Sequence, residues 1–344
     1  MTKRINLALQ GGGAHGAFTW GVLNVLLQDE GIEIAALSGT SAGALNGAAV
    51  KSGLVAGGRD GAVENLRWLW SQIGAVTEPE FAPWMSALSS SAAYWAKALE
   101  FSPAYAAFDF TTRMTSPYVY GPLMQNPLGR IVGDFHFDEV CAPDGPQLWI
   151  CATNVRSGKI KLFSGKDIGP KAIMASACLP SLFQAVEIED SETGKLEAYW
   201  DGGYTGNPAL YPLFHPDLPD DILVVNINPL YREELPTNSQ AIQNRINEIS
   251  FNSSLLRELR AISFVKRLLA DGTMGRGSMK DVLVHMISDD ELMNALNVAT
   301  KTIPTPVILD RLRLAGEVAA KAFLSAHRDD LNERGTVDLE AMFS

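Results

Sequence analysis

Two glycine-rich turns, each following a short apolar run, constrain the fold of this chain more than any other feature. The first run, residues 5–9, leads into "QGGGAHG", and the second, residues 32–39, leads into "GTSAG". Segments with helical spacing of apolar residues follow each turn, at 14–28 and 42–53. Alternation of strand and helix predicts an α/β fold with a mostly parallel central sheet flanked by helices. Apolar patterning also predicts a helix at 62–75 and strands at 147–153, 160–164, 184–189, 196–200 and 222–228.

Composition excludes several classes of protein. The chain has 344 residues, of which 47% are apolar, enough for a sizeable core. Its formal net charge of −11 disfavours a nucleic-acid binder, which would need a basic surface. The three cysteines lack CxxC spacing, so neither a disulfide framework nor a cysteine zinc site is expected. No apolar run reaches transmembrane length, and the short N-terminal run does not resemble a signal peptide. These features predict a cytoplasmic protein without a transmembrane segment.

The glycine loop has two competing interpretations. Gly11, Gly13 and Gly16 fit the G-x-G-x-x-G pattern of a dinucleotide-binding turn. Such a fold needs an acidic residue at the end of the second strand, about twenty positions on. Glu33 lies near that distance, but it opens the strand instead of closing it. The dinucleotide interpretation therefore lacks its ribose ligand.

The second interpretation starts from Ser41, the centre of a G-x-S-x-G motif between Gly39 and Gly43. In a nucleophile elbow, the serine occupies a tight turn between a strand and a helix, and small neighbours let that turn close. Attack on an ester carbonyl creates an oxyanion, which preorganised backbone amides can bind. The successive amides of Gly11, Gly12 and Gly13 could form such a hole.

A nucleophilic serine also needs a base. None of the four histidines after Ser41 lies in a recognisable catalytic loop, whereas "YWDGG" at 199–203 places Asp201 at the end of an apolar strand. Partial burial beside Tyr199 and Trp200 would raise the basicity of this carboxylate. Gly202 and Gly203 allow a sharp turn directly after it. Asp201 is therefore the candidate base.

The motifs "GGGAHG", "GTSAG" and "DGG", in this order, together with "ASACLPSLFQAVEI" at 175–188, resemble those of the patatin-like phospholipase family. The resemblance covers about residues 5–230. It implies a three-layer α/β/α fold and a phospholipase A-type lipid acyl hydrolase that needs no metal or other cofactor. It further implies that Ser41 and Asp201 form a Ser–Asp dyad without histidine. One position departs from the family pattern: His15 stands where arginine or lysine is often found, and its charge would vary with pH.

We expect a catalytic region at 1–235 and a helical C-terminal extension at 236–344 without strands. The segment 81–120 holds ten of the 29 aromatic residues and is a candidate lid or acyl groove, or ordinary core. A basic amphipathic helix at 255–269 could lie on a membrane surface or cover the core.

Alternative functions also remain at this point. The substrate could be another acyl ester, such as a thioester or a storage polyester, or the protein could bind lipid without catalysis. The sequence leaves open whether the chain forms a homo-oligomer and whether it contacts a membrane peripherally.

Overall fold

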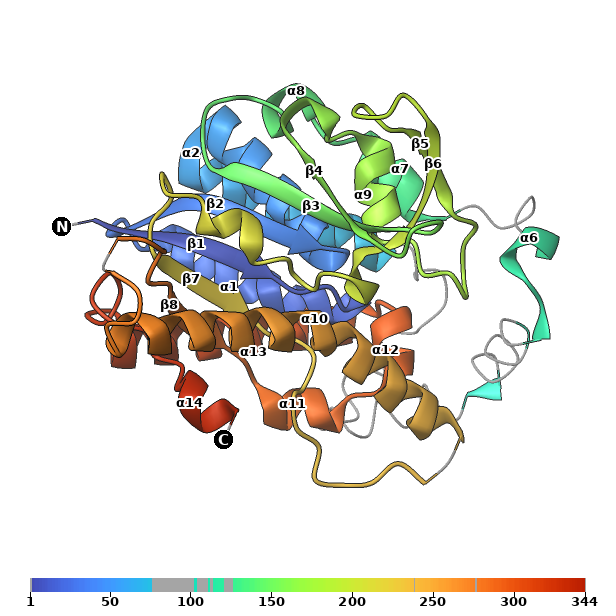
Figure 1. Cartoon of the computed structure of the whole chain (residues 1–344). Coiled ribbons are helices and arrows are strands. Elements are labelled where there is room, and N and C mark those ends of the chain that lie inside the picture. Colours follow the sequence, from blue (N-terminus) through green and yellow to red (C-terminus); the bar gives the residue numbers. More distant parts are fainter. Residues whose placement is uncertain are drawn as a thin grey trace.

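The computed structural model describes residues 2–75, 102–103, 111, 114–120, 126–237, 239–275 and 277–343. Within these residues, eight strands form one mixed sheet in the order β5-β6-β3-β2-β1-β7-β8, with β4 paired to β3 (Figure 1). The strands are β1 (Lys3–Leu9), β2 (Ile32–Thr40), β3 (Gln147–Asn154), β4 (Ile160–Ser164), β5 (Val186–Glu189), β6 (Leu196–Asp201), β7 (Asp221–Val225) and β8 (Leu283–Ile287). Pairing among β8, β7, β1, β2 and β3 is parallel, whereas β4, β5 and β6 pair antiparallel.

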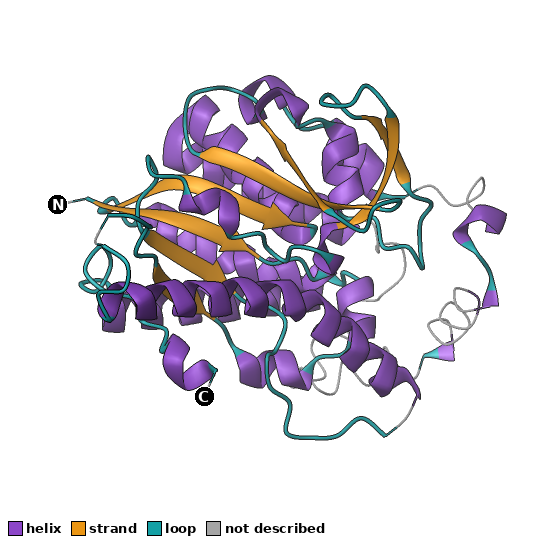
Figure 2. Cartoon of the chain, in the orientation of Figure 1, coloured by secondary structure: helices purple, strands orange, loops and turns teal. Residues whose placement is uncertain are grey.

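Helices cover both faces of the sheet and produce the expected three layers (Figure 2). The helices are α1 (Gly16–Gln28), α2 (Ala42–Ala75), α6 (Pro117–Tyr120), α7 (Leu128–Gly133), α8 (Phe137–Val140), α9 (Pro170–Ser176), α10 (Ser239–Ala270), α11 (Asp290–Ala295), α12 (Val298–Thr302), α13 (Pro306–His327) and α14 (Leu339–Met342). Because side chains alternate along a strand, Leu7 and Leu9 join the core that contains α1, α2 and α13. Ala8 joins a second core beneath α10.

The pairing of β3 brings two strand ends together. Along one edge, β3 pairs with the end of β2, where Thr40 lies opposite Cys151. The next residue of β3, Ala152, pairs with Asp201 at the end of the antiparallel β6. Since β4 occupies the other edge of β3 over the same residues, β2 and β6 share one edge and meet end to end. The residues that follow Thr40 and the side chain of Asp201 therefore lie beside each other.

The C-terminal region corrects one expectation. It is largely helical, as predicted, but it also contributes β8, which pairs in parallel with β7. The polar side chain of His285 interrupts the apolar pattern of this strand, yet it is buried and bonded to Asp221 across the pair, with 2.9 Å between Nε2 and Oδ1. On the other face, α13 packs closely on α1, because Gly21 and Gly316 each lie against backbone atoms of the partner helix.

The amphipathic stretch 255–269 lies within α10, and its apolar residues Leu255, Leu259 and Ile262 are buried in the core beneath that helix. This apolar face therefore packs inside the protein, which favours the core-covering interpretation over membrane docking. Most of the aromatic segment 81–120 lies outside the described residues, so its predicted role stays a prediction. In the part of the chain that the structure describes, no helix is long and apolar enough to cross a membrane.

Candidate active site

Ser41 occupies a strained turn between β2 and α2. Its φ of 54° lies in the left-handed region, which non-glycine residues rarely adopt, and its side chain is almost buried. Close packing enforces the turn, since a side chain on Gly43 would collide with the backbone carbonyl of Leu9. The amide of Ser41 donates to Oγ of Ser176, at the end of α9, over 2.8 Å. This geometry is that of a nucleophile elbow.

The glycine loop crosses directly over this elbow. A Cβ atom on Gly11 would lie 2.7 Å from Cβ of Ser41, so a residue with a side chain cannot replace it without displacement. The amide of Gly11 donates to Oδ1 of Asn207 over 2.6 Å, and its carbonyl accepts from Nδ2 of Asn228 over 2.8 Å. Among the described residues, the amides of Gly12 and Gly13 donate to no acceptor. These two amides are thus available to an anion, whereas Gly11 holds the loop in place.

Asp201 faces the elbow from β6. The residue is 1% exposed, its Oδ1 accepts from the amide of Gly203 over 2.8 Å, and its carboxylate lies close enough to the hydroxyl of Ser41 for that hydroxyl to lower its pKa. Burial raises the pKa of Asp201 to about 7, and the Gly203 amide and the Ser41 hydroxyl oppose that rise. Its amide donates to the carbonyl of Cys178 and its carbonyl accepts from Oγ1 of Thr153, both over 2.8 Å. A rigid backbone therefore presents a carboxylate of unusual basicity to the hydroxyl.

His15 lies below the glycine loop and is 1% exposed. Burial lowers its pKa well below the ordinary value, and the cations Lys301 and Arg232 lower it further, so the ring is neutral near pH 7. Its Nε2 lies 2.8 Å from Oγ1 of Thr300, while its buried Nδ1 has no hydrogen-bond partner among the described residues. His15 therefore supplies no positive charge at this position.

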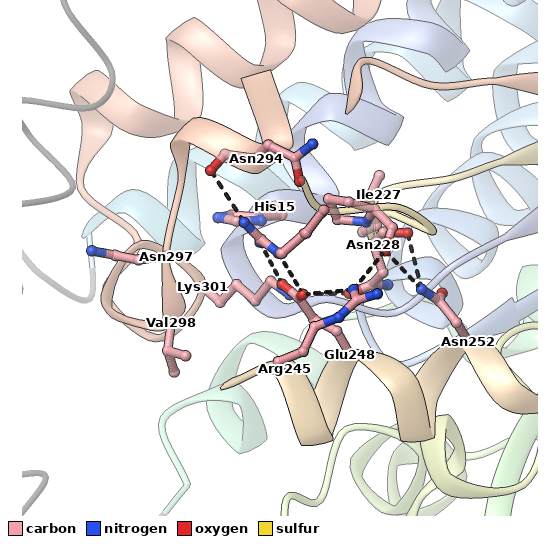
Figure 3. Close-up of polar contacts among 12 residues, drawn as sticks. His15, Ile227, Asn228, Arg245, Glu248, Asn252, Asn294, Asn297, Val298 and Lys301 are labelled. Atoms are coloured by element: carbon pink, nitrogen blue, oxygen red, sulfur yellow. Dashed lines mark hydrogen bonds and ion pairs between the residues drawn. The ribbon is translucent and has the colours of Figure 1, made fainter. Parts of the chain in front are cut away.

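Positive charge beside the loop comes instead from Arg232 and from Arg245 and Lys301 of the C-terminal region (Figure 3). The carboxylate of Glu248 on α10 is 1% exposed and pairs with Arg232 at 2.7 Å, Arg245 at 3.4 Å and Lys301 at 3.5 Å. Burial alone would raise the pKa of Glu248, but these three cations hold it below its ordinary value. Three cations share one carboxylate, so the cluster has an excess of positive charge.

Comparison with known proteins identifies the family. A family model described as patatin-like phospholipase matches residues 7–214, which include all three motifs. The chain belongs to the patatin-like phospholipase family. No curated protein matches the sequence.

Two solved structures are similar to this patatin-like chain. One is VipD from Legionella pneumophila, with 16% identity, coverage of 94% of this chain and 67% of that chain, and a TM-score of 0.41. The other is the ExoU–SpcU complex of the type III secretion system of Pseudomonas aeruginosa, with 18% identity, coverage of 96% and 61%, and a TM-score of 0.29.

The structure brings the predicted site residues of this patatin-like protein together: Gly11, Gly12, Gly13, Ser41 and Asp201. The remaining motif glycines pack closely too, Gly16 against Ala42, Gly39 against Gly43, Gly202 against Cys151 and Gly203 against Phe251. Glu33, weighed as a ribose ligand, pairs with Arg4 near the opposite end of the sheet.

Sequence reasoning missed four side chains that support the site: Ser176, Asn207, Asn228 and Lys301. Ser176 lies within the stretch 175–188 that resembles the family, and Asn207 follows the Asp-Gly-Gly turn closely, so both had a local signal. Asn228 and Lys301 had no local signal in the sequence, because their proximity to the glycine loop arises only from the tertiary fold.

Proposed function

We propose that the protein hydrolyses fatty acyl esters of lipids, as a phospholipase A-type enzyme, through a Ser41–Asp201 dyad. The observation that carries this proposal is the position of Ser41 beside the buried carboxylate of Asp201, whose pKa is about 7. A base with a pKa near the working pH is ionised often enough to act and basic enough to accept a proton. Family membership supports lipid esters as the substrate class.

In the proposed reaction, Oγ of Ser41 attacks the acyl carbonyl carbon while Asp201 takes the hydroxyl proton. The amides of Gly12 and Gly13 bind the oxyanion of the tetrahedral intermediate. Collapse of this intermediate expels the alcohol, which receives the proton from Asp201, and leaves an acyl group on Ser41. Water then attacks the acyl-enzyme, with Asp201 again accepting a proton. The second tetrahedral intermediate collapses, the fatty acid is released, and Asp201 returns the proton to Oγ of Ser41, which regenerates the free enzyme. These steps use only side chains and amides of this chain.

Labelling with a fluorophosphonate probe tests the proposal. Such a probe phosphonylates an activated serine, so the wild type should label and the Ser41→Ala variant should not. Asp201→Asn should label at least a hundredfold more slowly, on the order of the loss from removing a general base. Ser157→Ala, at an exposed turn serine, serves as the control and should label like the wild type.

If the folded wild type is labelled neither in buffer nor with mixed lipid–detergent micelles, the proposed dyad is refuted. If labelling succeeds, a substrate panel decides the chemistry. Release of fatty acid from phospholipids supports the proposal, whereas exclusive turnover of thioesters or polyesters would replace its substrate class. A cytoplasmic location and contact with a membrane surface remain predictions from the sequence.

A further inference from the structure

A chain of hydrogen bonds connects the charged cluster with the glycine loop, and Figure 3 shows its part from Lys301 to Asn228. Nζ of Lys301 lies 3.1 Å from Oδ1 of Asn228, and Nδ2 of Asn228 donates to the carbonyl of Gly11 over 2.8 Å. The carbonyl of Gly11 belongs to the same peptide group as the amide of Gly12. The chain therefore begins at Lys301 in the C-terminal region and ends at the amide of Gly12, which donates to no acceptor among the described residues.

The orientation of Asn228 in this chain is fixed by its other contacts. Its backbone amide donates to Oε1 of Gln10 over 3.0 Å, and its Nδ2 contacts the same oxygen over 3.1 Å. Its backbone carbonyl accepts from Nδ2 of Asn252 over 3.2 Å. Because Nδ2 is directed at Gln10 and Gly11, Oδ1 must face Lys301.

The position of Lys301 is also fixed. Its backbone carbonyl packs against Gly13, where any side chain would collide with it. The preceding residue, Thr300, contacts His15. The side chain of Lys301 is 18% exposed, and burial lowers its pKa, whereas the carboxylate of Glu248, 3.5 Å away, opposes that fall and favours the charged form that donates to Asn228. Because the ring of His15 is neutral near pH 7, His15 contributes no positive charge to the glycine loop.

Hydrogen bonds in series polarise one another, and the effect is strongest away from water. A donor on a peptide carbonyl draws electron density toward the oxygen and makes the N–H of the same peptide group a stronger donor. We propose that Lys301 is a positioning residue for ester hydrolysis, which polarises the Gly11–Gly12 peptide group through Asn228 and so strengthens the Gly12 amide as an oxyanion donor. This inference rests on the proposed function, and it assigns part of the active-site electrostatics to the C-terminal region.

The test compares Lys301→Met with Lys280→Met. Lys280 is a matched control, since its Nζ donates to three backbone carbonyls, those of Leu213, His215 and Leu218, in another part of the protein. With a p-nitrophenyl acyl ester, Lys301→Met should lower kcat about tenfold and leave KM unchanged. Loss of a direct oxyanion donor costs about a hundredfold or more, and a relayed contribution should be smaller. Lys301→Arg should recover most of kcat, and Lys280→Met should leave it unchanged.

A pair of inhibitors separates the relay from a structural role. A trifluoromethyl ketone adds to Ser41 and forms a hemiketal oxyanion, whereas the parent methyl ketone binds mainly as the neutral carbonyl. Lys301→Met should weaken the trifluoromethyl ketone about tenfold and leave the methyl ketone unaffected. Equal weakening of both ketones, or a change in KM alone, would overturn the proposal.

Asn228→Leu tests the relay from its other end, and it carries the test alone if Lys301→Met does not fold. It should reproduce the loss in kcat, and the double variant should lose little more than either single variant, because both interrupt one chain. Independent, multiplicative losses would refute the relay. Failure of the wild type to label at Ser41 would instead refute the proposed function, so the two failures can be distinguished.

Discussion

The Asp201→Asn variant tests whether burial of the Asp201 carboxyl group, which the proposed catalysis requires, lowers the free energy of unfolding. Asparagine keeps the size of aspartate and an oxygen that can accept from the amide of Gly203, but it cannot ionise. In the wild type, burial raises the pKa of Asp201 from 3.8 to about 7. This difference corresponds to about 4 kcal/mol, at about 1.4 kcal/mol per pH unit.

The sign of the effect follows from proton binding. Between pH 3.8 and about 7 the folded state holds a proton on Asp201 that the unfolded chain releases. The free energy of unfolding therefore falls as the pH rises through this interval, and it stays lower above pH 7. The amide side chain in the variant does not titrate, so it adds no such dependence. The stability advantage of Asp201→Asn should grow by about 3 kcal/mol between pH 5 and pH 8.

Urea unfolding of both proteins at pH 5 and pH 8 measures this difference, because ionisable groups common to both cancel. Asp190→Asn is the matched control. The Lys161 ammonium, 2.9 Å away, holds the pKa of Asp190 below its ordinary value, so this variant should be less stable than the wild type at both pH values. If the advantage of Asp201→Asn were the same at pH 5 and pH 8, Asp201 would titrate near its ordinary pKa and the reasoning would fail.

Three further predictions concern the same site. The value of kcat/KM for an uncharged ester should rise tenfold per pH unit up to about pH 7, where Asp201 ionises, and then level off; a midpoint near pH 4 would contradict this. Gly43→Ala should lower the free energy of unfolding by about 2 kcal/mol and abolish fluorophosphonate labelling, since its methyl group would meet the backbone of β1. Gly57→Ala, which has open space around it, should neither lower the free energy of unfolding nor abolish labelling. Urea unfolding compares the Gly43 and Gly57 variants. Ser176→Ala should cost about 1–3 kcal/mol by leaving a buried amide unpaired. It should also lower kcat more than it raises KM, whereas unchanged steady-state kinetics would show that the elbow holds without this bond.

The parts of the molecule that could be predicted from the sequence are those specified by a short, contiguous sequence pattern. Short apolar runs with glycine at their ends mark buried strands, and apolar patterning located seven of the eight strands in the described part of the chain. Ser41 and Asp201 were identifiable because each follows or ends such a run within a short motif. Burial of Asp201 was expected from its aromatic neighbours and agrees with the structure.

The rest depends on contacts between distant residues. In β8, the polar residue His285 breaks the apolar pattern by which a buried strand is recognised. The cost of burying its ring is offset by partners distant in the sequence, such as Asp221, 64 positions earlier in the chain. Asn228 reaches Gly11 across 217 positions and lies 73 positions before Lys301. Asparagine and lysine at such positions resemble ordinary surface residues in the sequence, so only the fold reveals their role.

The end-to-end meeting of β2 and β6 on β3 restricts how this protein can change during evolution or design. Thr40 and Asp201 pair with consecutive residues of β3, so the sheet itself sets the spacing between Ser41 and Asp201. A slip of one residue in β6 would turn Asp201 to the opposite face, and a slip of two would move it by about 6.6 Å. Insertions should therefore be tolerated in the turns at 155–159 and 190–195 but not within β3 or β6. Under the proposed mechanism, new substrate preferences would have to come from the surrounding segments, with Ser41 and Asp201 left unchanged.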